Sequence, residues 1–511
     1  MQRLTHLSRI SLMLAVFFAL DKGLAILRQI IIARIFRLSP ELDAFNAANN
    51  LPDLLFALIS GGALAIAFIP VLSEYLTKRG QPAAWELFSR IANLAFVVTA
   101  GLAVIIAAFA HPLVGWQLGV APGFGPDQQR LVAELMRLNL IATLIFSLSG
   151  LVMAGLQANQ HFLLPAIAPL LYNLGQIFGA LVLSPREGLH LGALTLPGFG
   201  LGVYGLVYGV IAGAALHLAI QIPGLLRYHF RWTPAIGLRS ESVRQVLRLL
   251  GPRLLTMLFI QLIFIARDNL ASRLETGAVS ALTYGWMLLQ VPETLIGTAI
   301  GTAMLPTLAE QVARGEWEQF HRTVERALQV LLALTLPIAA VLSLGLGPLI
   351  EIAFKFGPQG SALLLWTTRA FMVGLLGQSF LEVASRSFYA QQEARLPLLA
   401  SGLNLVVFVL LAALALRILG APGIALAISI SFTLEALFLL FLLQRRLPAR
   451  LSVVESLART LLAAAAGGGL VFLLMAAIPM PPLPLSIAAM AVGGVAFLPF
   501  VWREVRFLSN L

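Results

Sequence analysis

The chain has 511 residues, 59% hydrophobic and only 11% charged, with a mean hydropathy of +0.91; because soluble domains carry about 25% charged residues, this composition predicts a polytopic membrane protein. The absence of cysteine excludes disulfides, thiolate nucleophiles and cysteine-ligated metals. The net charge of +11 indicates basic loops on one membrane face, and we expect no nucleic-acid partner.

Apolar stretches long enough to cross a bilayer, about 20 residues each, follow one another along the chain. They predict about fourteen transmembrane helices, in residues 9–36, 41–77, 86–112, 130–156, 163–184, 198–225, 246–272, 279–311, 322–355, 361–390, 396–418, 421–444, 455–478 and 482–502.

The first predicted helix carries three charged residues, Asp21, Lys22 and Arg28, where a bilayer is thickest. A charge there costs at least about 2.5–3.5 kcal/mol and faces a cavity, a partner or a transport path. Asp21 and Arg28 share a helix face but lie about 10 Å apart. A cationic, water-filled cavity and ion pairing between helices are both open explanations. Lys22 and Arg28 point about 120° apart on a straight helix, so both line one cavity only if the helix bends, which we expect near Gly23.

The second predicted helix opens with "RLSPELDAF", in which Ser39 is the expected N-cap. An acidic residue in a first turn stabilises the helix dipole, so the residues alone allow either capping or function for Asp43. The same two interpretations apply to Asp53, which follows Pro52.

Four pairs of segments resemble one another at offsets of roughly 230–240 residues. "FIPVLSEYLTKRG" from Phe68 matches "MLPTLAEQVARG" from Met304, and "RQIIIAR", "LPDLL" and "LQANQHFLLP" match "RDNLASR", "VPETL" and "FYAQQEARLP". The offset corresponds to six helices, an even number, so both copies enter the membrane from the same side and the repeats are parallel. Arg267 is thereby the symmetry-related counterpart of Arg28, with Asp268 beside it.

The expected fold class is therefore all-α, with two parallel six-helix lobes and two further helices. We assign the first lobe to residues 1–240, the second to 241–448, and the additional pair to 449–511. Basic residues gather in alternate loops, for example Lys78, Arg79 and Arg90. This asymmetry predicts that both termini are cytoplasmic.

Catalytic and metal-binding motifs are missing: the sequence has no HExxH, P-loop or GxSxG pattern. We expect no enzyme activity, no cofactor and no metal, and the sequence does not identify a coupling ion. Embedded cations suit an anionic substrate, above all a phosphate or pyrophosphate, which arginine binds in a bidentate manner.

Several stretches are similar to the MurJ (MviN) family, flippases that move lipid II across the bacterial inner membrane. They include "LRQIIIARIF", "LDAFNAANNLPDLLFALISGGALAIAFIPVLSEY", "GTAMLPTLAE" and "SFYAQQEARLPL". The resemblance implies the multidrug/oligosaccharidyl-lipid/polysaccharide exporter fold, alternating access and a cationic central cavity for the lipid's pyrophosphate. It also implies that the last two helices form a groove for the polyprenyl tail.

Carried over to this sequence, the resemblance implies that Arg28 and Asp43 occupy essential positions. Lys22 stands where the family has an arginine, so the charge is kept without the bidentate fork. Phe56 and Met287 stand where the family carries two further arginines. We expect Arg28, Lys22, Asp43 and Arg267 to bind substrate, with Asp21, Asp53 and Asp268 as secondary candidates.

The leading interpretation is a flippase for lipid II in the inner membrane, in contact with membrane lipids and with cell-wall synthesis proteins as possible partners. Three alternatives stay open. The chain could export another undecaprenyl-pyrophosphate-linked glycan, or exchange a small molecule for a cation, or be a non-transporting scaffold for envelope-synthesis enzymes. The antiporter predicts functional carboxylates at Asp21, Asp43 or Asp268 rather than a functional Arg28.

Overall fold

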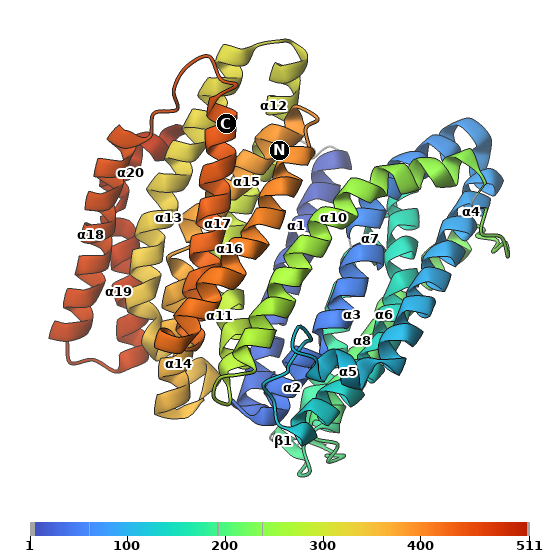
Figure 1. Ribbon diagram of the computed structural model, residues 1–511, viewed down its shortest axis with the longest axis horizontal. Coiled ribbons are helices and arrows are strands. Elements are labelled where there is room, and N and C mark those ends of the chain that lie inside the picture. Colours follow the sequence, from blue (N-terminus) through green and yellow to red (C-terminus); the bar gives the residue numbers. More distant parts are fainter. Residues whose placement is uncertain (1–5, 61, 192–193, 238, 508–511) are drawn as a thin grey trace. The chain divides into compact units, whose positions relative to one another are not determined.

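The computed structural model describes residues 6–60, 62–191, 194–237 and 239–507. It divides into two compact units, Met1–Asn269 and Leu270–Leu511. Helices make up nearly all of both units, which confirms the all-α fold class (Figure 1). One short antiparallel hairpin is the exception among the described residues: β1 (Leu189–Leu191) pairs with β2 (Leu194–Leu196) in the loop before α8.

The first unit contains the two strands, and its helices follow in chain order. They are α1 (His6–Phe36), α2 (Pro40–Ala48), α3 (Asn50–Leu55), the π-helix η1 (Phe56–Ser60), α4 (Gly62–Ala108), α5 (Ala110–Gly115), α6 (Pro126–Ala158), α7 (Leu163–Phe178), the π-helix η2 (Gly179–Leu183), α8 (Val203–Ala219), α9 (Ile222–Arg227) and most of α10 (Glu241–Ala271).

The second unit contains the remaining helices. They are α11 (Ala278–Glu293), the π-helix η3 (Thr294–Thr298), α12 (Ala299–Ala313), α13 (Trp317–Phe354), α14 (Gly357–Met372), α15 (Leu375–Ala390), α16 (Arg395–Leu419), α17 (Ala421–Gln444), α18 (Val454–Ala477), α19 (Pro482–Ala496) and α20 (Leu498–Val505).

The long helix α4 is interrupted at Gly80, whose φ of 79° and ψ of 173° are not helical. A residue with a side chain rarely adopts such a positive φ, and glycine does so without steric cost. The break separates the second predicted helix from the third. Beyond it, Trp85 and Phe88 pack edge-to-face on Phe230, and the Trp85 indole donates to the carbonyl oxygen of Tyr228 at 2.8 Å. The segment between α9 and α10 is therefore fixed to α4.

Among the described residues, ten helices are long and apolar enough to span a membrane, or twelve if each of two bent helix pairs is one span. One bent pair is α14 with α15, and the other is α19 with α20. The two remaining predicted helices correspond to α1 and to the stretch from α2 through η1 into the first part of α4.

The two predicted copies show matching local structure. A π-helix follows the Pro-acid pair in each: η1 comes after Pro52 and Asp53, and η3 comes after Pro292 and Glu293. The last helix of each copy begins after a glycine of nearly identical conformation, Gly202 (φ 56°, ψ −136°) before α8 and Gly420 (φ 62°, ψ −137°) before α17. These matches support the duplication inferred from the sequence.

The predicted lobe boundary at residue 240 stays a prediction, because α10 runs continuously from Glu241 across the division between the two units. The two additional helices predicted in 449–511 correspond to α18 and to the bent pair α19–α20. Val341 of α13 packs in one apolar cluster with Val471 of α18 and Ala489 of α19. The terminal residues 1–5 and 508–511 lie outside the described residues, and the cytoplasmic location of the termini stays a prediction.

Close contact between glycines joins α7 and the π-helix η2 that follows it to α8 in the first unit. A Cβ at Gly175 would lie 2.3 Å from the Cα of Gly213, and a Cβ at Gly209 would lie 2.7 Å from the Cα of Gly179. These separations are shorter than any van der Waals contact and involve backbone atoms, which cannot rotate away. Small residues let membrane helices approach closely in this way.

We predict that Gly209→Ala lowers the free energy of unfolding by about 1–3 kcal/mol, because overpacking forces the two backbones apart. Gly101→Ala on α4 is the matched control, since nothing lies within 4 Å of its added Cβ. Thermal unfolding of both variants in detergent measures the difference. Equal melting temperatures for the two variants would contradict the close packing of α7 and α8.

Candidate functional site

Arg28 and Asp21 are connected through a side chain from another helix. The Arg28 Nη1 donates to Oδ1 of Asn173 on α7 at 2.8 Å, and the Asn173 Nδ2 donates to Oδ1 of Asp21 at 2.8 Å. Asn173 is 3% exposed. The amide spans the distance that separates the two charges along α1, so one neutral residue holds both the cation and the anion in place.

The two cations of α1 lie in different surroundings. The guanidinium of Arg28 is partly buried and lies 5.9 Å from the ring centre of Tyr172 on α7. Lys22 is exposed, and its Nζ lies 5.3 Å from the ring centre of Phe18. The helix α1 is continuous through Gly23. A helix that continues without a break at Gly23 points Lys22 and Arg28 in different directions, which agrees with their different surroundings.

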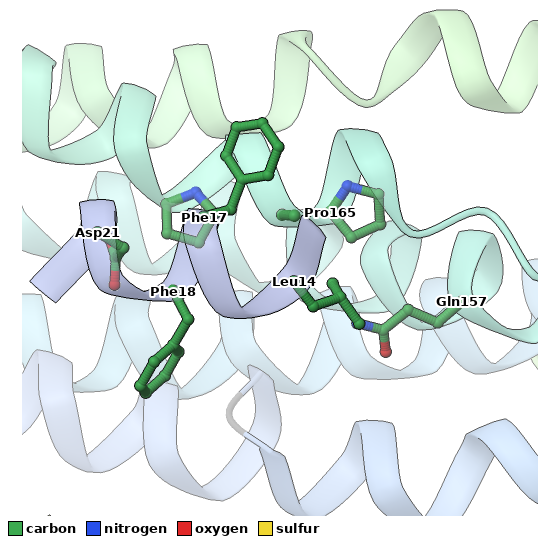
Figure 2. A pocket seen from close by; sticks show the side chains of 8 residues that line it. Leu14, Phe17, Phe18, Asp21, Gln157 and Pro165 are labelled. Carbon is green, nitrogen blue, oxygen red and sulfur yellow. The ribbon is translucent and has the colours of Figure 1, made fainter. Parts of the chain in front are cut away.

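A cavity of about 410 Å³ lies beside Asp21, between α1, α6 and α7. Figure 2 shows Leu14, Phe17, Phe18 and Asp21 of α1 around it, with Gln157 and Pro165 from the facing elements. Its walls are mostly apolar, and Asp21 contributes the charge. The cavity therefore combines an apolar lining with a polar point at the Asn173 bridge.

A second cavity of about 330 Å³ lies inside the same unit and shares Pro169 with the first. Its polar lining consists of Asn49, in the turn between α2 and α3, and of five residues from four helices: Asp53, Asn139, Thr143, Tyr172 and His217. The Oδ1 of Asn139 is buried there without a hydrogen-bond partner among the described residues. More polar side chains therefore line this cavity than the first, and the Asn139 oxygen can accept a hydrogen bond from a ligand.

Phe56 forms one wall of the second cavity. Its ring packs edge-to-face on Phe146 at 5.3 Å, and Phe146 in turn contacts Tyr172 at 5.0 Å and His217 at 5.3 Å. Phe56, which stands where the family has an arginine, thus belongs to an aromatic cluster that includes Tyr172, the ring beside Arg28. Met287, the second such replacement, is half-buried on α11 in the other unit.

The expected cap of the second helix is confirmed, because the amide of Leu42 donates to the hydroxyl oxygen of Ser39 at 3.2 Å. Asp43 lies in the first turn of α2 and is 1% exposed. Ser39 fills the cap position, so Asp43 is not the N-cap, but its place in the first turn still lets its carboxylate stabilise the helix dipole.

Arg267 and Asp268 are both buried and pair with each other. The Arg267 Nε donates to Asp268 Oδ1 at 2.7 Å, and the second carboxylate oxygen accepts from Asn50 Nδ2 at 2.7 Å. This contact ties α10 to α3. Within this ion pair, the Arg267 side chain is 8% exposed. Its expected contact with substrate stays a prediction, as do the expected contacts of the other candidates.

The second unit repeats the polar character of the first at the equivalent π-helix. Glu293, directly before η3, accepts from the Thr298 hydroxyl at 3.0 Å, and Arg386 of α15 pairs with Glu382. In the part of the chain that the structure describes, no group of three or more His, Asp or Glu side chains is arranged to hold a metal ion.

Sequence reasoning did not identify Asn173, Tyr172 or Asn50. Each is an ordinary residue in an apolar helix, and its importance depends on which helix packs against it. The sequence contains only an indirect signal. Asp21 and Arg28 lie on the same face of the helix but too far apart to pair directly, so a residue of another helix that lies between them is needed to connect them.

The family model of the lipid II flippase MurJ matches residues 32–490. The lipid II flippase MurJ of Burkholderia cenocepacia is 30% identical over 452 residues, covering 86% of this chain and 84% of that protein. A probable lipid II flippase MurJ of Rhizobium meliloti is 27% identical, covering 81% and 76%.

Solved structures agree on the fold. A lipid II flippase MurJ in an inward closed conformation superposes with a TM-score of 0.78 at 19% identity, covering 97% of this chain and 99% of that one. An inward-facing multidrug resistance MATE family transporter of the MOP superfamily gives a TM-score of 0.67 at 16% identity, covering 83% and 94%. These levels of identity support the fold alone.

We predict that Arg267→Met lowers the free energy of unfolding by about 3–5 kcal/mol, because the Asp268 carboxylate is left buried with only the Asn50 amide. The double variant Arg267→Met/Asp268→Leu recovers part of this loss, because the Asp268 carboxylate is then no longer buried without its cation. Thermal unfolding in detergent checks both.

Arg130→Met is the control for the same chemical change, because Arg130 pairs with Asp127 on the exposed surface, where such pairs contribute little. An Arg267→Met protein with the stability of the wild type would show that the buried pair does not stabilise the first unit.

Proposed function

The chain belongs to the family of the lipid II flippase MurJ, and from that premise we propose that it moves lipid II across the bacterial inner membrane by alternating access. It is a multi-pass membrane transporter. The observation that carries the proposal is the partly buried Arg28, held by the neutral amide of Asn173 in the interior of the first unit. This guanidinium is the group to which we assign the pyrophosphate of the lipid.

The bond between Arg28 and Asn173 supports exchange for an anionic ligand. Asn173 offers a neutral carbonyl oxygen, and a pyrophosphate offers charged oxygens, which form roughly twofold stronger hydrogen bonds with a guanidinium. The planar guanidinium also binds two phosphate oxygens at once. A pyrophosphate can therefore displace the amide from Arg28, while the amide NH2 keeps its bond to Asp21.

The glycan part of the substrate is assigned to the 330 Å³ cavity. Its amides, Asp53 carboxylate and aromatic rings supply the hydrogen-bond partners and apolar faces that sugars need. The presence of Phe56 and Met287 at positions where the family has arginines favours a second candidate substrate, another undecaprenyl-pyrophosphate-linked glycan. The two candidates share the pyrophosphate at Arg28 and differ in the glycan.

Further parts of the proposal concern the remaining interactions of the chain. The additional helices α18, α19 and α20 are proposed to contact the polyprenyl tail, and membrane lipids surround the apolar surface. Cell-wall synthesis proteins are the proposed protein partners, and both termini are proposed to be cytoplasmic. Transport at Arg28 requires no bond to be made or broken in the substrate, so no enzymatic step is proposed.

We predict that this protein restores growth to a bacterium depleted of its resident lipid II flippase, and that Arg28→Ala abolishes the rescue. Arg28→Lys retains a charge but loses the bidentate fork, so we expect partial rescue. Colony formation after depletion, with membrane levels of each variant measured by immunoblot, provides the test.

Arg34→Ala is the matched control on the same helix, because Arg34 is exposed near the end of α1 and has the same chemistry. Full rescue by a well-expressed Arg28→Ala protein would refute the assignment and favour the non-transporting scaffold. Failure of the wild type, with normal expression, would favour the other lipid-linked glycan as substrate.

We predict that Phe56→Arg changes which glycan is transported while leaving the protein folded. The new guanidinium would enter the 330 Å³ cavity, where Asp53 and the Phe146 ring are available to it. If the native substrate is lipid II, rescue by Phe56→Arg equals or exceeds that of the wild type. Phe56→Leu is the control, since it removes the ring without adding charge, and identical rescue by all three proteins would exclude Phe56 from substrate selection.

A further inference from the structure

Glu435 is a carboxylic acid deep within an apolar helix. It lies on α17, about 21 Å from the N-terminal end and about 14 Å from the C-terminal end at 1.5 Å per residue. The helix is one of the candidate membrane spans, and Glu435 is 6% exposed. An ionised carboxylate in such a position is unfavourable unless a cation or several donors compensate it.

The groups that contact Glu435 are neutral and come from α16. The Ser401 hydroxyl oxygen lies 2.8 Å from Oε1, and the Asn404 Nδ2 donates to Oε2 at 2.6 Å. Ser401 is 8% exposed and Asn404 is 2% exposed. Among the described residues, no lysine, arginine or histidine lies within ion-pair distance of this carboxyl.

The charged residues of the other helices packed around α17 are engaged elsewhere. On α14, Arg369 donates to the carbonyl oxygen of Ser343 at 2.7 Å. On α15, Arg386 and Glu382 pair with each other, and on α11, Glu293 accepts from Thr298. None of these groups lies within hydrogen-bond or ion-pair distance of Glu435, whose hydrogen-bond partners among the described residues are the neutral Ser401 and Asn404.

Both close contacts of the Ser401 hydroxyl can be hydrogen bonds at the same time only if Glu435 is protonated. The Ser401 hydroxyl oxygen is within hydrogen-bond distance of both Glu435 Oε1 and the carbonyl oxygen of Pro397, at 2.8 and 3.0 Å. A hydroxyl has one hydrogen to donate. If Glu435 carries a proton, the acid donates to Ser401 and Ser401 donates to Pro397, so both contacts are hydrogen bonds.

The equivalent point of the first unit also carries a buried titratable group. His217 follows the positive-φ Gly202 by fifteen residues, as Glu435 follows Gly420. His217 is 5% exposed, and its Nδ1 lies 2.6 Å from the hydroxyl oxygen of Ser149 on a neighbouring helix. The two copies thus place a proton-accepting side chain against a serine at the same position of their last helix.

We propose that Glu435 is a proton-binding site of the second unit, which takes a proton from water and holds it between Oε1 and Ser401. When water reaches the carboxyl, the proton returns to solvent and the carboxylate is hydrated. This goes beyond the proposed flippase activity, which names no coupling ion.

Infrared difference spectroscopy on the full-length protein in lipid nanodiscs tests the proposal without measuring transport. We expect the wild type at neutral pH to show the carbonyl band of a protonated carboxylic acid, and Glu435→Gln to lack it. Glutamine mimics the protonated form, because its NH2 donates to Ser401 and its oxygen accepts from Asn404. We therefore expect an unchanged melting temperature for this variant.

Glu310→Gln is the matched control, because Glu310 is exposed and pairs with Arg314, so its removal leaves the band unaltered. Absence of the band from the wild type, or its persistence in Glu435→Gln, would overturn the proposal. Loss of the band on adding sodium at constant pH would also overturn it, because the site would then bind a metal cation. Complementation is measured separately, so a failed flippase assignment is distinguishable from a failed proton site.

Discussion

An asparagine amide that donates to a carboxylate on a neighbouring helix recurs at the polar points of this structure. Asn173 contacts Asp21, Asn50 contacts Asp268, and Asn404 contacts Glu435, with N···O distances between 2.6 and 2.8 Å. In a bilayer no water is available to solvate a buried carboxylate, so protein donors must do so. A neutral amide solvates the acid while adding no charge of its own, and each contact also joins two helices.

The three contacts differ in what else reaches the acid, and this difference separates their roles. Asp268 has a direct cation in Arg267, so that point is an ion pair within α10, which the Asn50 amide joins to α3. Asp21 is linked through the amide to Arg28, which keeps an acid and a base apart within one site. Among the described residues, Glu435 meets only the neutral side chains of Ser401 and Asn404. The first arrangement is suited to stabilising the fold, the second to binding an anion that can be exchanged, and the third to binding a proton.

Much of the fold could be predicted because it depends on local sequence. The lengths of the apolar stretches predict the helices, and Ser39 and Pro40 predict the start of α2. Matching segments such as "LPDLL" and "VPETL" predict a duplication, which the two π-helices support. The break at Gly80 was anticipated only as a gap between predicted helices. The bridge at Asn173 could not be predicted, because it depends on the packing of α7 against α1, which no local pattern specifies. The ion pair of Arg267 was equally hidden, since neighbours in sequence rarely face each other on a helix.

The π-helices also record the history of the chain. A π-turn is a rare, single-turn irregularity within an α-helix, and the same irregularity follows Pro52–Asp53 in one copy and Pro292–Glu293 in the other. Independent origin at both places requires two rare events, whereas one event in an ancestral six-helix protein accounts for both. The third π-turn, η2 after α7, has no counterpart in α16, which is α-helical from Arg395 to Leu419. For the duplication that the sequence repeats predict, the simplest order of events places η1 and η3 before the duplication and η2 after it, when the two halves had begun to diverge.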